Sequence, residues 1–225
     1  MAHAKVNDLR TRNDKAWAHL KAQLQGMEPH LDKSDAPGQW TTREVLCHML
    51  FEPGWKPVPL LKTFADKNLP VIDIKPSLAD VTAERKSMTL KQFADALEGQ
   101  RRDVMNYLDG LSEAELSRKS RIPLFKEIMG TDEVDIPTYV GALFEYHWND
   151  HAGQLAKIRK AAGLPDAKGM LSALLADHEA VIQTLRGDLA TAMDKFSDAG
   201  TSDFLTGLME KHEKMAWMLR AFVEA

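Results

Sequence analysis

The sequence has little that would cross-link it, export it or insert it into a membrane. It contains one cysteine, Cys47, in 225 residues, so no disulfide can form within the chain, and a lone thiol is typical of a reducing compartment. No apolar run reaches the roughly 18 residues of a membrane span, and the first ten residues lack the apolar core of a signal peptide. We therefore expect a cytoplasmic protein with no membrane partner.

The sequence also has no surplus of positive charge. Lysine and arginine total 29 against 33 for aspartate and glutamate, and no basic cluster stands out. Proteins that follow a nucleic-acid backbone usually carry a basic patch, so we expect no nucleic-acid partner. The acidic surplus is confined to residues 166–225, since residues 1–165 hold equal numbers of each sign. This change predicts a domain boundary near residue 165.

Familiar catalytic motifs are missing as well. The chain has no G-x-S-x-G elbow, no Walker A loop and no G-x-G-x-x-G phosphate loop, so we assign no catalytic residue. Apolar residues make up 44% of the chain, and almost all of the periodic ones repeat with the helical period. This periodicity predicts an all-α fold. At about 150 residues per domain, the length predicts either one large domain or one domain with an appendage.

Start and stop signals divide the chain into helices. A capping box, in which a threonine or serine is followed three residues later by glutamate or glutamine, occurs three times: Thr41 with Glu44, Thr89 with Gln92, and Ser112 with Glu115. Gly163–Pro165 is a strong stop signal. The expected helices cover residues 4–27, 41–50, 89–109, a short stretch from 112, 137–162, 169–194 and 202–224. The expected loops are 67–88, 120–136 and the turn at 197–202.

The helix predicted over 137–162 carries two histidines on an otherwise apolar face. His147 and His151 are four residues apart, which places both imidazoles on one side of the helix. Burying two imidazoles is costly unless each has a partner, and a divalent metal would supply one partner to both. A histidine on an apolar face is more often a hydrogen-bonded core residue, so this pair alone leaves both interpretations open.

His48 is the candidate third ligand. It lies among apolar residues of the predicted helix 41–50 and could face the other two histidines within one bundle. Three histidines with an open fourth position suit Zn²⁺, Ni²⁺, Co²⁺ or Fe²⁺, and imidazole does not choose among them. The second ring nitrogen of each histidine needs its own partner, and four neighbours in sequence are candidates for that role: Glu52, Glu145, Asn149 and Asp150.

Other reactive side chains near the motif have simpler interpretations. Cys47 directly precedes His48, so on a helix it points about 100° away and is expected to be a packed core thiol. Two arginine pairs, 101–102 and 118 with 121, could anchor a carboxylate, although exposed helix and loop charges are the more ordinary interpretation.

Two segments resemble the DinB-like family. Residues 40–50 are similar to its W-[ST]-x-x-E-[VI]-L-x-H-[LM] segment, and residues 144–155 are similar to its late helix, H-x-x-x-H-x-x-Q-[IL]. The resemblance covers roughly residues 5–165. It implies a four-helix bundle in which His48, His147 and His151 bind a divalent metal, with Zn²⁺ or Ni²⁺ preferred and Fe²⁺, Co²⁺ or Mn²⁺ as alternatives. It also implies a metal-dependent transferase or isomerase using a low-molecular-weight thiol, or a hydrolase acting on a small molecule.

The C-terminal segment resembles a different family. Residues 198–205 and 212–221 are similar to the last two helices of Dps-type ferritin-like proteins. That family carries its iron ligands on its first two helices, which have no counterpart here, so neither ferroxidase activity nor DNA protection is expected.

The predicted organisation is therefore a DinB-like bundle with the metal site over residues 1–165, followed by a two-helix hairpin over residues 166–225. A hairpin with apolar stripes on both helices is unstable alone, so it must pack on the bundle or on a second copy. The second possibility gives the homodimer that we expect. The alternative to an enzyme is a non-enzymatic stress or interaction module with a structural metal and hairpin-mediated oligomerisation.

Overall fold

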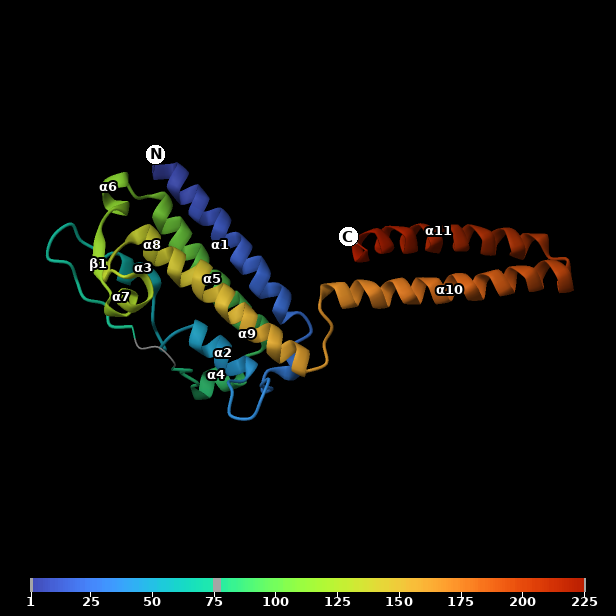
Figure 1. Cartoon of the computed structure of the whole chain (residues 1–225), viewed down its shortest axis with the longest axis horizontal. Coiled ribbons are helices and arrows are strands. Elements are labelled where there is room, and N and C mark those ends of the chain that lie inside the picture. The colour runs from blue at the N-terminus through green and yellow to red at the C-terminus, as the bar shows by residue number, and fades with distance from the viewer. Residues whose placement is uncertain (1, 75–77, 225) are drawn as a thin grey trace. The chain divides into compact units, whose positions relative to one another are not determined.

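The chain forms two compact units in the computed structural model, which describes residues 2–74 and 78–224. The first unit is Met1–Gly163 and the second is Leu164–Ala225 (Figure 1). The predicted boundary lay at residue 165. Within the described ranges, no helix has both the length and the apolar character needed to cross a membrane.

Four helices build the first unit. They are α1 (Ala2–Leu24), α2 (Thr42–Met49), α5 (Leu90–Asp109) and α9 (His147–Ala161). Both α1 and α2 pack against α5 and α9, so the four surround one core (Figure 1). The core is filled by large apolar side chains, among them Leu9, Leu20, Phe93, Leu97 and Trp148. The predicted all-α four-helix bundle is confirmed.

The helix starts follow the predicted capping boxes. Thr41, Thr89 and Ser112 each accept a hydrogen bond from the backbone N–H three residues later, and the glutamate or glutamine at that position bonds back to the cap. These caps begin α2, α5 and the short α6 (Glu113–Leu116). A capping box satisfies two orphan backbone donors, which fixes where each helix begins.

Two stretches that were predicted to be loops contain short elements. Within 67–88, the side chain of Thr82 caps α4 (Ala83–Ser87), and this helix is too short to show an apolar period. Within 120–136, two three-residue strands pair antiparallel around α7 (Pro123–Met129): β1 (Lys119–Arg121) and β2 (Glu133–Asp135). Strands of that length show no readable alternation. Two further short elements are the 3₁₀ turn Glu28–His30 and α3 (Pro57–Leu61).

The predicted single helix over 137–162 is interrupted. It consists of α8 (Ile136–Val140), a π-helical turn at Gly141–Tyr146, and α9. The N–H of His147 bonds to the carbonyl of Ala142, five residues earlier instead of four. A π turn inserts one residue and rotates everything after it around the helix axis, and such turns often occur at functional sites. The two histidines follow directly after it.

The second unit is the predicted two-helix hairpin, formed by α10 (Ala167–Phe196) and α11 (Ala199–Val223). Aspartate side chains cap both helices, Asp166 for α10 and Asp198 for α11. The turn is shorter than the predicted 197–202, because Ser197 adopts a left-handed conformation (φ 51°) and Asp198 caps α11 immediately.

Candidate metal centre

Three histidines from two helices converge in the first unit. His48 lies in the last turn of α2, while His147 and His151 lie in the first two turns of α9. The Nε2 atom of His147 is 3.1 Å from Nε2 of His48 and 3.0 Å from Nε2 of His151. One nitrogen from each ring lies within 4.8 Å of the other two. The structure thus brings together the three residues that the sequence singled out.

The outer ring nitrogens of two histidines are held by hydrogen bonds. Nδ1 of His48 donates to the backbone carbonyl of Leu78 at 2.9 Å, and Nδ1 of His151 donates to Oε1 of Gln154 at 2.9 Å. A carbonyl oxygen only accepts, so the proton of each neutral ring lies on Nδ1. Each Nε2 therefore presents a lone pair to the centre of the cluster.

The outer partners differ from the four candidates named from the sequence. Glu145 pairs with Arg12, and Asn149 is bonded to His19 at 3.0 Å. Asp150 acts on His151 only through its charge, which raises the pKa of that ring. Glu52 acts through its charge on a buried tyrosine, Tyr139.

Two outer partners were missed, for different reasons. Gln154 belongs to the H-x-x-x-H-x-x-Q pattern and follows His151 by three residues, so its helical neighbourhood could have identified it. Leu78 lies 30 residues from His48 in an extended segment, and its contact is made by the backbone. No side-chain pattern could have signalled that contact.

Burial favours the neutral form of two of the three histidines, His147 and His151. The pKa of His147 is lowered from 6.5 to about 3, chiefly by burial and then by the charges of His151 and His48. Burial also lowers the pKa of His151, against a smaller opposing effect from Gln154. Nδ1 of His147 makes only a weak interaction with the backbone of Leu143 and no hydrogen bond of ordinary geometry. Neutral imidazoles whose lone pairs converge match the donor set that a divalent cation prefers.

Arg85 holds the segment that orients His48. Its side chain is 8% exposed and donates to two backbone carbonyls, that of Cys47 at 3.2 Å and that of Asp80 at 3.0 Å. Cys47 adjoins His48, and Asp80 follows Leu78 by two residues. Arg85 therefore ties the end of α2 to the segment that carries the Leu78 carbonyl. No motif in the sequence points to Arg85.

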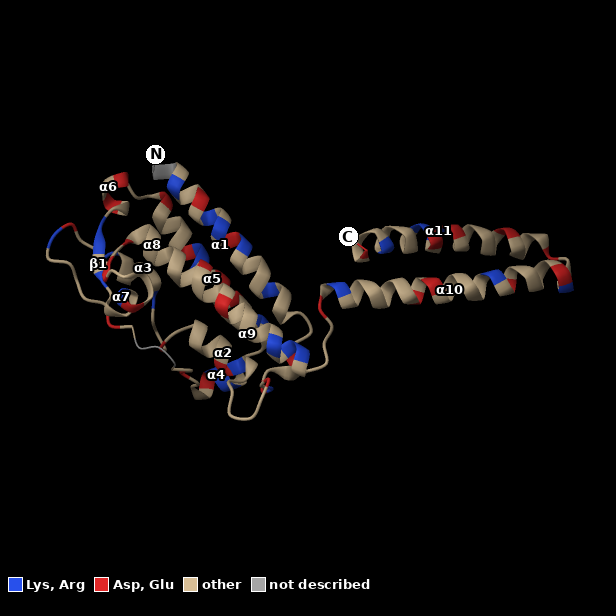
Figure 2. Cartoon of the chain, in the orientation of Figure 1, with Lys and Arg blue, Asp and Glu red and all other residues tan. Residues whose placement is uncertain are grey.

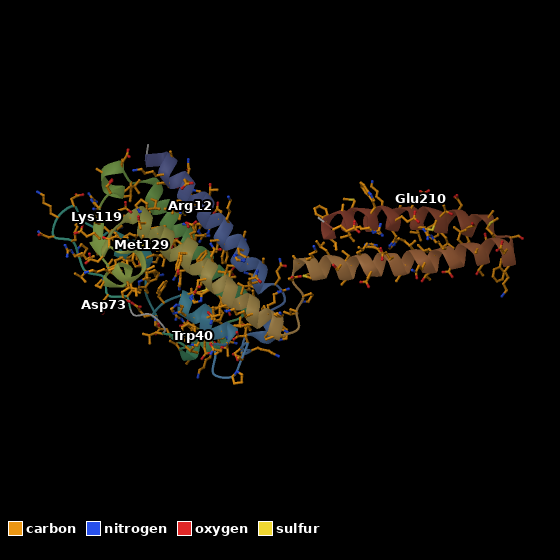
Figure 3. All side chains as sticks on the ribbon, in the orientation of Figure 1. Arg12, Trp40, Asp73, Lys119, Met129 and Glu210 are labelled. Atoms are coloured by element: carbon orange, nitrogen blue, oxygen red, sulfur yellow. The ribbon has the colours of Figure 1, made fainter. Side chains whose placement is uncertain are left out.

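An aromatic wall stands beside the three histidines. The ring of Trp40 lies 5.0 Å from the ring of His48, and the ring of Phe51 lies 5.6 Å from that of His147. Trp55 extends this wall, with its ring 4.3 Å from Phe51. Figure 3 places Trp40 at the end of the bundle that holds α2 and α4. These rings make one side of the cluster apolar.

The other reactive side chains have structural roles. Cys47 is buried and burial raises the pKa of its thiol, as expected of a packed core cysteine. Arg101 is paired with Asp14 and Glu98. Arg118 and Arg121 are likewise paired, with the carboxylates of Asp66, Glu115, Asp132 and Glu133. These arginines already have acidic partners.

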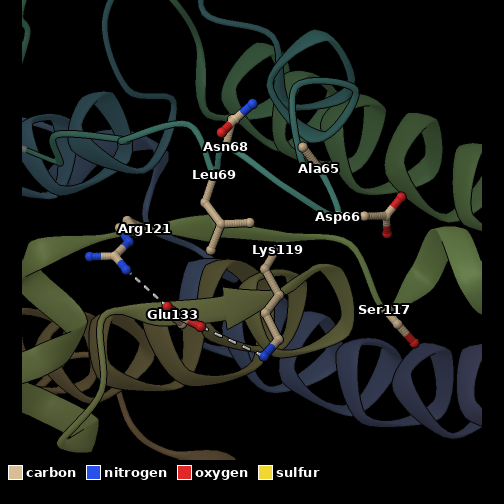
Figure 4. A pocket seen from close by; sticks show the side chains of 8 residues that line it. All are labelled: Ala65, Asp66, Asn68, Leu69, Ser117, Lys119, Arg121 and Glu133. Atoms are coloured by element: carbon tan, nitrogen blue, oxygen red, sulfur yellow. Dashed lines mark hydrogen bonds and ion pairs between the residues drawn. The ribbon is translucent and has the colours of Figure 1, made fainter.

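A shallow groove beside β1 and β2 contains none of the three histidines. Lys119 and Arg121 line it, together with Glu133, which pairs with both of them (Figure 4). Basic and acidic residues are also interspersed along α1 (Figure 2). The groove therefore offers no uncompensated positive charge for an anion.

The hydrogen bond from His151 to Gln154 is expected to matter for metal affinity. Replacing Gln154 with leucine removes the acceptor that fixes the tautomer of His151, so Zn²⁺ affinity is expected to fall about 10- to 100-fold. Gln154→Glu keeps an acceptor oxygen and should stay close to the wild type. Competition with a fluorescent zinc chelator measures both variants, and equal affinities for wild type and Gln154→Leu would contradict this role.

Both units resemble known proteins. The model of a family described as a ferritin-like domain matches residues 85–225, more than half of the chain. The match covers α5 to α9 as well as the hairpin, so it is longer than the C-terminal resemblance seen in the sequence.

Within the described residues, the three histidines are the one cluster of three or more metal-ligating side chains. The carboxylate-rich site of di-iron bundles therefore has no counterpart there.

A low-temperature-induced protein of Nostoc sp. (strain PCC 7120) is 53% identical over 72 residues, which are 32% of this chain and 40% of that protein. DNA protection during starvation protein 2 of Bacillus anthracis is 37% identical over 70 residues, which are 31% of this chain and 47% of that protein. The chain thus spans less than half the length of these curated relatives.

A solved structure supports the fold of the bundle. YfiT from Bacillus subtilis, described as a probable metal-dependent hydrolase with an unusual four-helix bundle topology, aligns with a TM-score of 0.55. The alignment covers 71% of this chain and 89% of YfiT at 17% sequence identity. At that identity the likeness is one of fold.

Proposed function

The chain belongs to the ferritin-like domain family, and we propose that its Met1–Gly163 unit binds one divalent metal ion and acts on a small molecule. Its substrate would be a low-molecular-weight thiol or another small compound. The reaction would be a metal-dependent thiol transfer or a metal-dependent hydrolysis. YfiT, which has the same fold, is described as a probable metal-dependent hydrolase.

One observation carries this proposal. Nε2 atoms of His48, His147 and His151 converge from two helices, and the protons of His48 and His151 are held on their outer nitrogens. The Nε2 atoms of His48 and His151 therefore face the centre as acceptors, beside Nε2 of His147. A cation bound there would satisfy these lone pairs together, which explains why the three rings converge. The DinB-like motif residues are the same three residues, which is the second line of support.

The residues of the chain have distinct roles in this proposal. His48, His147 and His151 would hold the ion through Nε2, while Gln154 and the Leu78 carbonyl keep two of the rings in the right tautomer. A divalent ion bound there would lower the pKa of a thiol or a water and so supply a nucleophile near neutral pH. The three histidines leave a coordination position free, which suits catalysis better than a structural site closed by four ligands.

The choice between a thiol and a water nucleophile can be tested with Co²⁺. Protein reloaded with Co²⁺ is titrated with glutathione, and a thiolate-to-cobalt absorption band is expected if a thiol is the natural ligand. A matched titration of His147→Ala should give no band. If the wild type shows no band while it hydrolyses simple esters, the transferase proposal is overturned in favour of a hydrolase. If neither response occurs with Co²⁺ bound, the enzyme proposal fails.

A second candidate function rests on the sequence relatives. Both the 53% identical protein, named for induction by low temperature, and the Bacillus anthracis protein, named for protection during starvation, are connected by name to stress. In this alternative the chain is a non-enzymatic stress or interaction module whose metal only stabilises the bundle. A metal-loaded crystal structure separates the two: a fourth ligand from the chain favours the module, and an exchangeable water or thiol favours the enzyme.

A further inference from the structure

The backbone of Phe51 adopts a left-handed conformation just after the helix that carries His48. Its φ is 58°, and its N–H donates to the carbonyl of His48 at 2.9 Å. Helices commonly end with one left-handed residue, but that residue is usually glycine or asparagine, because Cβ crowds the following carbonyl oxygen in this conformation. A phenylalanine here therefore carries a backbone cost that the turn itself does not require.

Two other helices of the same bundle end with glycine at this position. Gly26 and Gly163 each lie two residues after the last residue of their helix, α1 and α9, and their φ angles are 74° and 75°. Phe51 stands at the same distance from the end of α2. Three other described residues that are left-handed and not glycine have small polar side chains: Asn68, Asp80 and Ser197. Among the described residues, Phe51 is thus the one large apolar residue in this conformation.

The ring of Phe51 lies against two of the three histidines. Its centroid is 5.6 Å from the ring of His147 and 6.4 Å from the ring of His48, which is the range in which aromatic rings pack. The ring of Trp55 lies 4.3 Å from it. Because His48 belongs to α2 and His147 to α9, Phe51 joins the two helices at the point where their candidate ligands meet.

His147 is the histidine that most needs such a contact. The rings of His48 and His151 are fixed through Nδ1, by the Leu78 carbonyl and by Gln154. Nδ1 of His147 has no hydrogen bond of ordinary geometry. Rotation of an imidazole about its Cβ–Cγ bond is only weakly restricted by the side chain itself. Packing therefore has to fix the direction in which Nε2 of His147 points.

We propose that Phe51 is a positioning residue of the metal centre. The left-handed turn directs its ring toward His147, and the ring holds that imidazole with Nε2 beside those of His48 and His151. Left-handed residues other than glycine persist where the surrounding structure compensates for their cost, and they are concentrated at functional sites. The inference rests on the proposed metal binding, since Phe51 acts through a ligand.

The substitution Phe51→Gly separates the two roles that this residue could have. Glycine adopts the left-handed conformation readily, so the turn that ends α2 is kept, whereas the ring beside His147 is lost. If Phe51 only ended the helix, glycine would replace it without any loss of metal affinity. If Phe51 positions His147, glycine cannot replace it.

Competition with a fluorescent zinc chelator tests the proposal on the full chain, with circular dichroism to confirm folding. The Zn²⁺ affinity of Phe51→Gly is expected to fall about 10-fold, the low end of the loss caused by removing an outer partner of a ligand. Phe51→Tyr keeps the ring and should bind like the wild type. Ser197→Gly is the matched control, because it relieves a left-handed residue (φ 51°) of the second unit and should leave the affinity unchanged.

The Co²⁺ spectrum supplies a readout that a merely structural role would not change. At saturating Co²⁺, the d–d bands of Phe51→Gly are expected to differ from those of the wild type in position or intensity, because His147 is held less firmly. The bands of Ser197→Gly should match the wild type. An unchanged spectrum in Phe51→Gly would overturn the positioning role.

The outcomes also separate this inference from the proposed function. If the wild type binds Zn²⁺ and His147→Ala does not, wild-type affinity in Phe51→Gly would leave the metal site standing and overturn the positioning role. An equal loss in Phe51→Gly and Phe51→Tyr would overturn it too. If the wild type binds no Zn²⁺, both proposals fail.

A second variant keeps the proposal testable if Phe51→Gly does not fold. Asparagine also tolerates the left-handed conformation and lacks the ring, so Phe51→Asn is expected to show the same loss of Zn²⁺ affinity. Wild-type affinity in Phe51→Asn would contradict the positioning role.

Discussion

Replacing His147 with alanine is expected to weaken Zn²⁺ or Ni²⁺ binding by at least about 100-fold, because a lost ligand should cost more than the loss of an outer partner. The Nε2 atom of His147 is 3.1 Å from that of His48 and 3.0 Å from that of His151. The variant therefore keeps only two of the three imidazole nitrogens that could bind the ion. Isothermal titration of protein that was purified without an affinity tag measures the change.

The same variant separates a ligand from a core residue. His147 is half-buried, and its buried Nδ1 atom lacks an ordinary hydrogen bond. In the presence of a chelator, His147→Ala should therefore lose less stability than the deletion of a well-packed side chain of this size. Added Zn²⁺ should stabilise the wild type but not the variant, by mass action. His19→Ala, which removes an exposed histidine, is the control. Equal stabilisation of His147→Ala and wild type by Zn²⁺ would show that the ion binds elsewhere.

Acid is expected to destabilise the chelator-treated protein through the same histidine. In the unfolded chain His147 takes up a proton near its ordinary pKa of 6.5, whereas in the folded protein it does so only near a pKa of about 3. The unfolded state therefore binds more protons between these values, and stability falls as the pH falls. The slope for one proton is about 1.4 kcal/mol per pH unit. The lowered pKa of His151 acts with the same sign.

Denaturant unfolding from about pH 7 down to about pH 5 checks this expectation before most carboxylates titrate. His147→Gln keeps a polar side chain of similar size and removes the titrating ring. The stability difference between wild type and His147→Gln should therefore change with pH in favour of the variant as the pH falls. Parallel stability curves would mean that His147 is not held neutral by burial.

The sequence predicted the ligands of this site better than their surroundings. His147 and His151 could be placed together because the helical period alone sets their spacing, and the capping box at Thr41 located the helix that carries His48. The outer partner of His48 could not be predicted, since it is the backbone carbonyl of Leu78. Backbone contacts between distant segments leave no pattern in side chains.

The local backbone at the site could not be predicted from the sequence either. Residues 137–162 have an unbroken helical pattern, yet the chain inserts a π turn directly before His147. Packing of α9 against α1 and α2 fixes how far the histidines are rotated around the helix axis. This is an effect of tertiary structure, and helical periodicity in the sequence does not reveal it. For the same reason, strands as short as β1 and β2 form only because neighbouring segments hold them together.

The central claim is that His48, His147 and His151 hold one divalent ion. X-ray absorption of tag-free protein reloaded with Zn²⁺ tests it most directly, because the spectrum reports the atoms bound to the metal. The account predicts close to one ion per chain with three imidazole nitrogens at about 2.0–2.1 Å, and loss of that imidazole signature in His147→Ala. A shell of oxygen atoms alone, or an unchanged spectrum in His147→Ala, would contradict it.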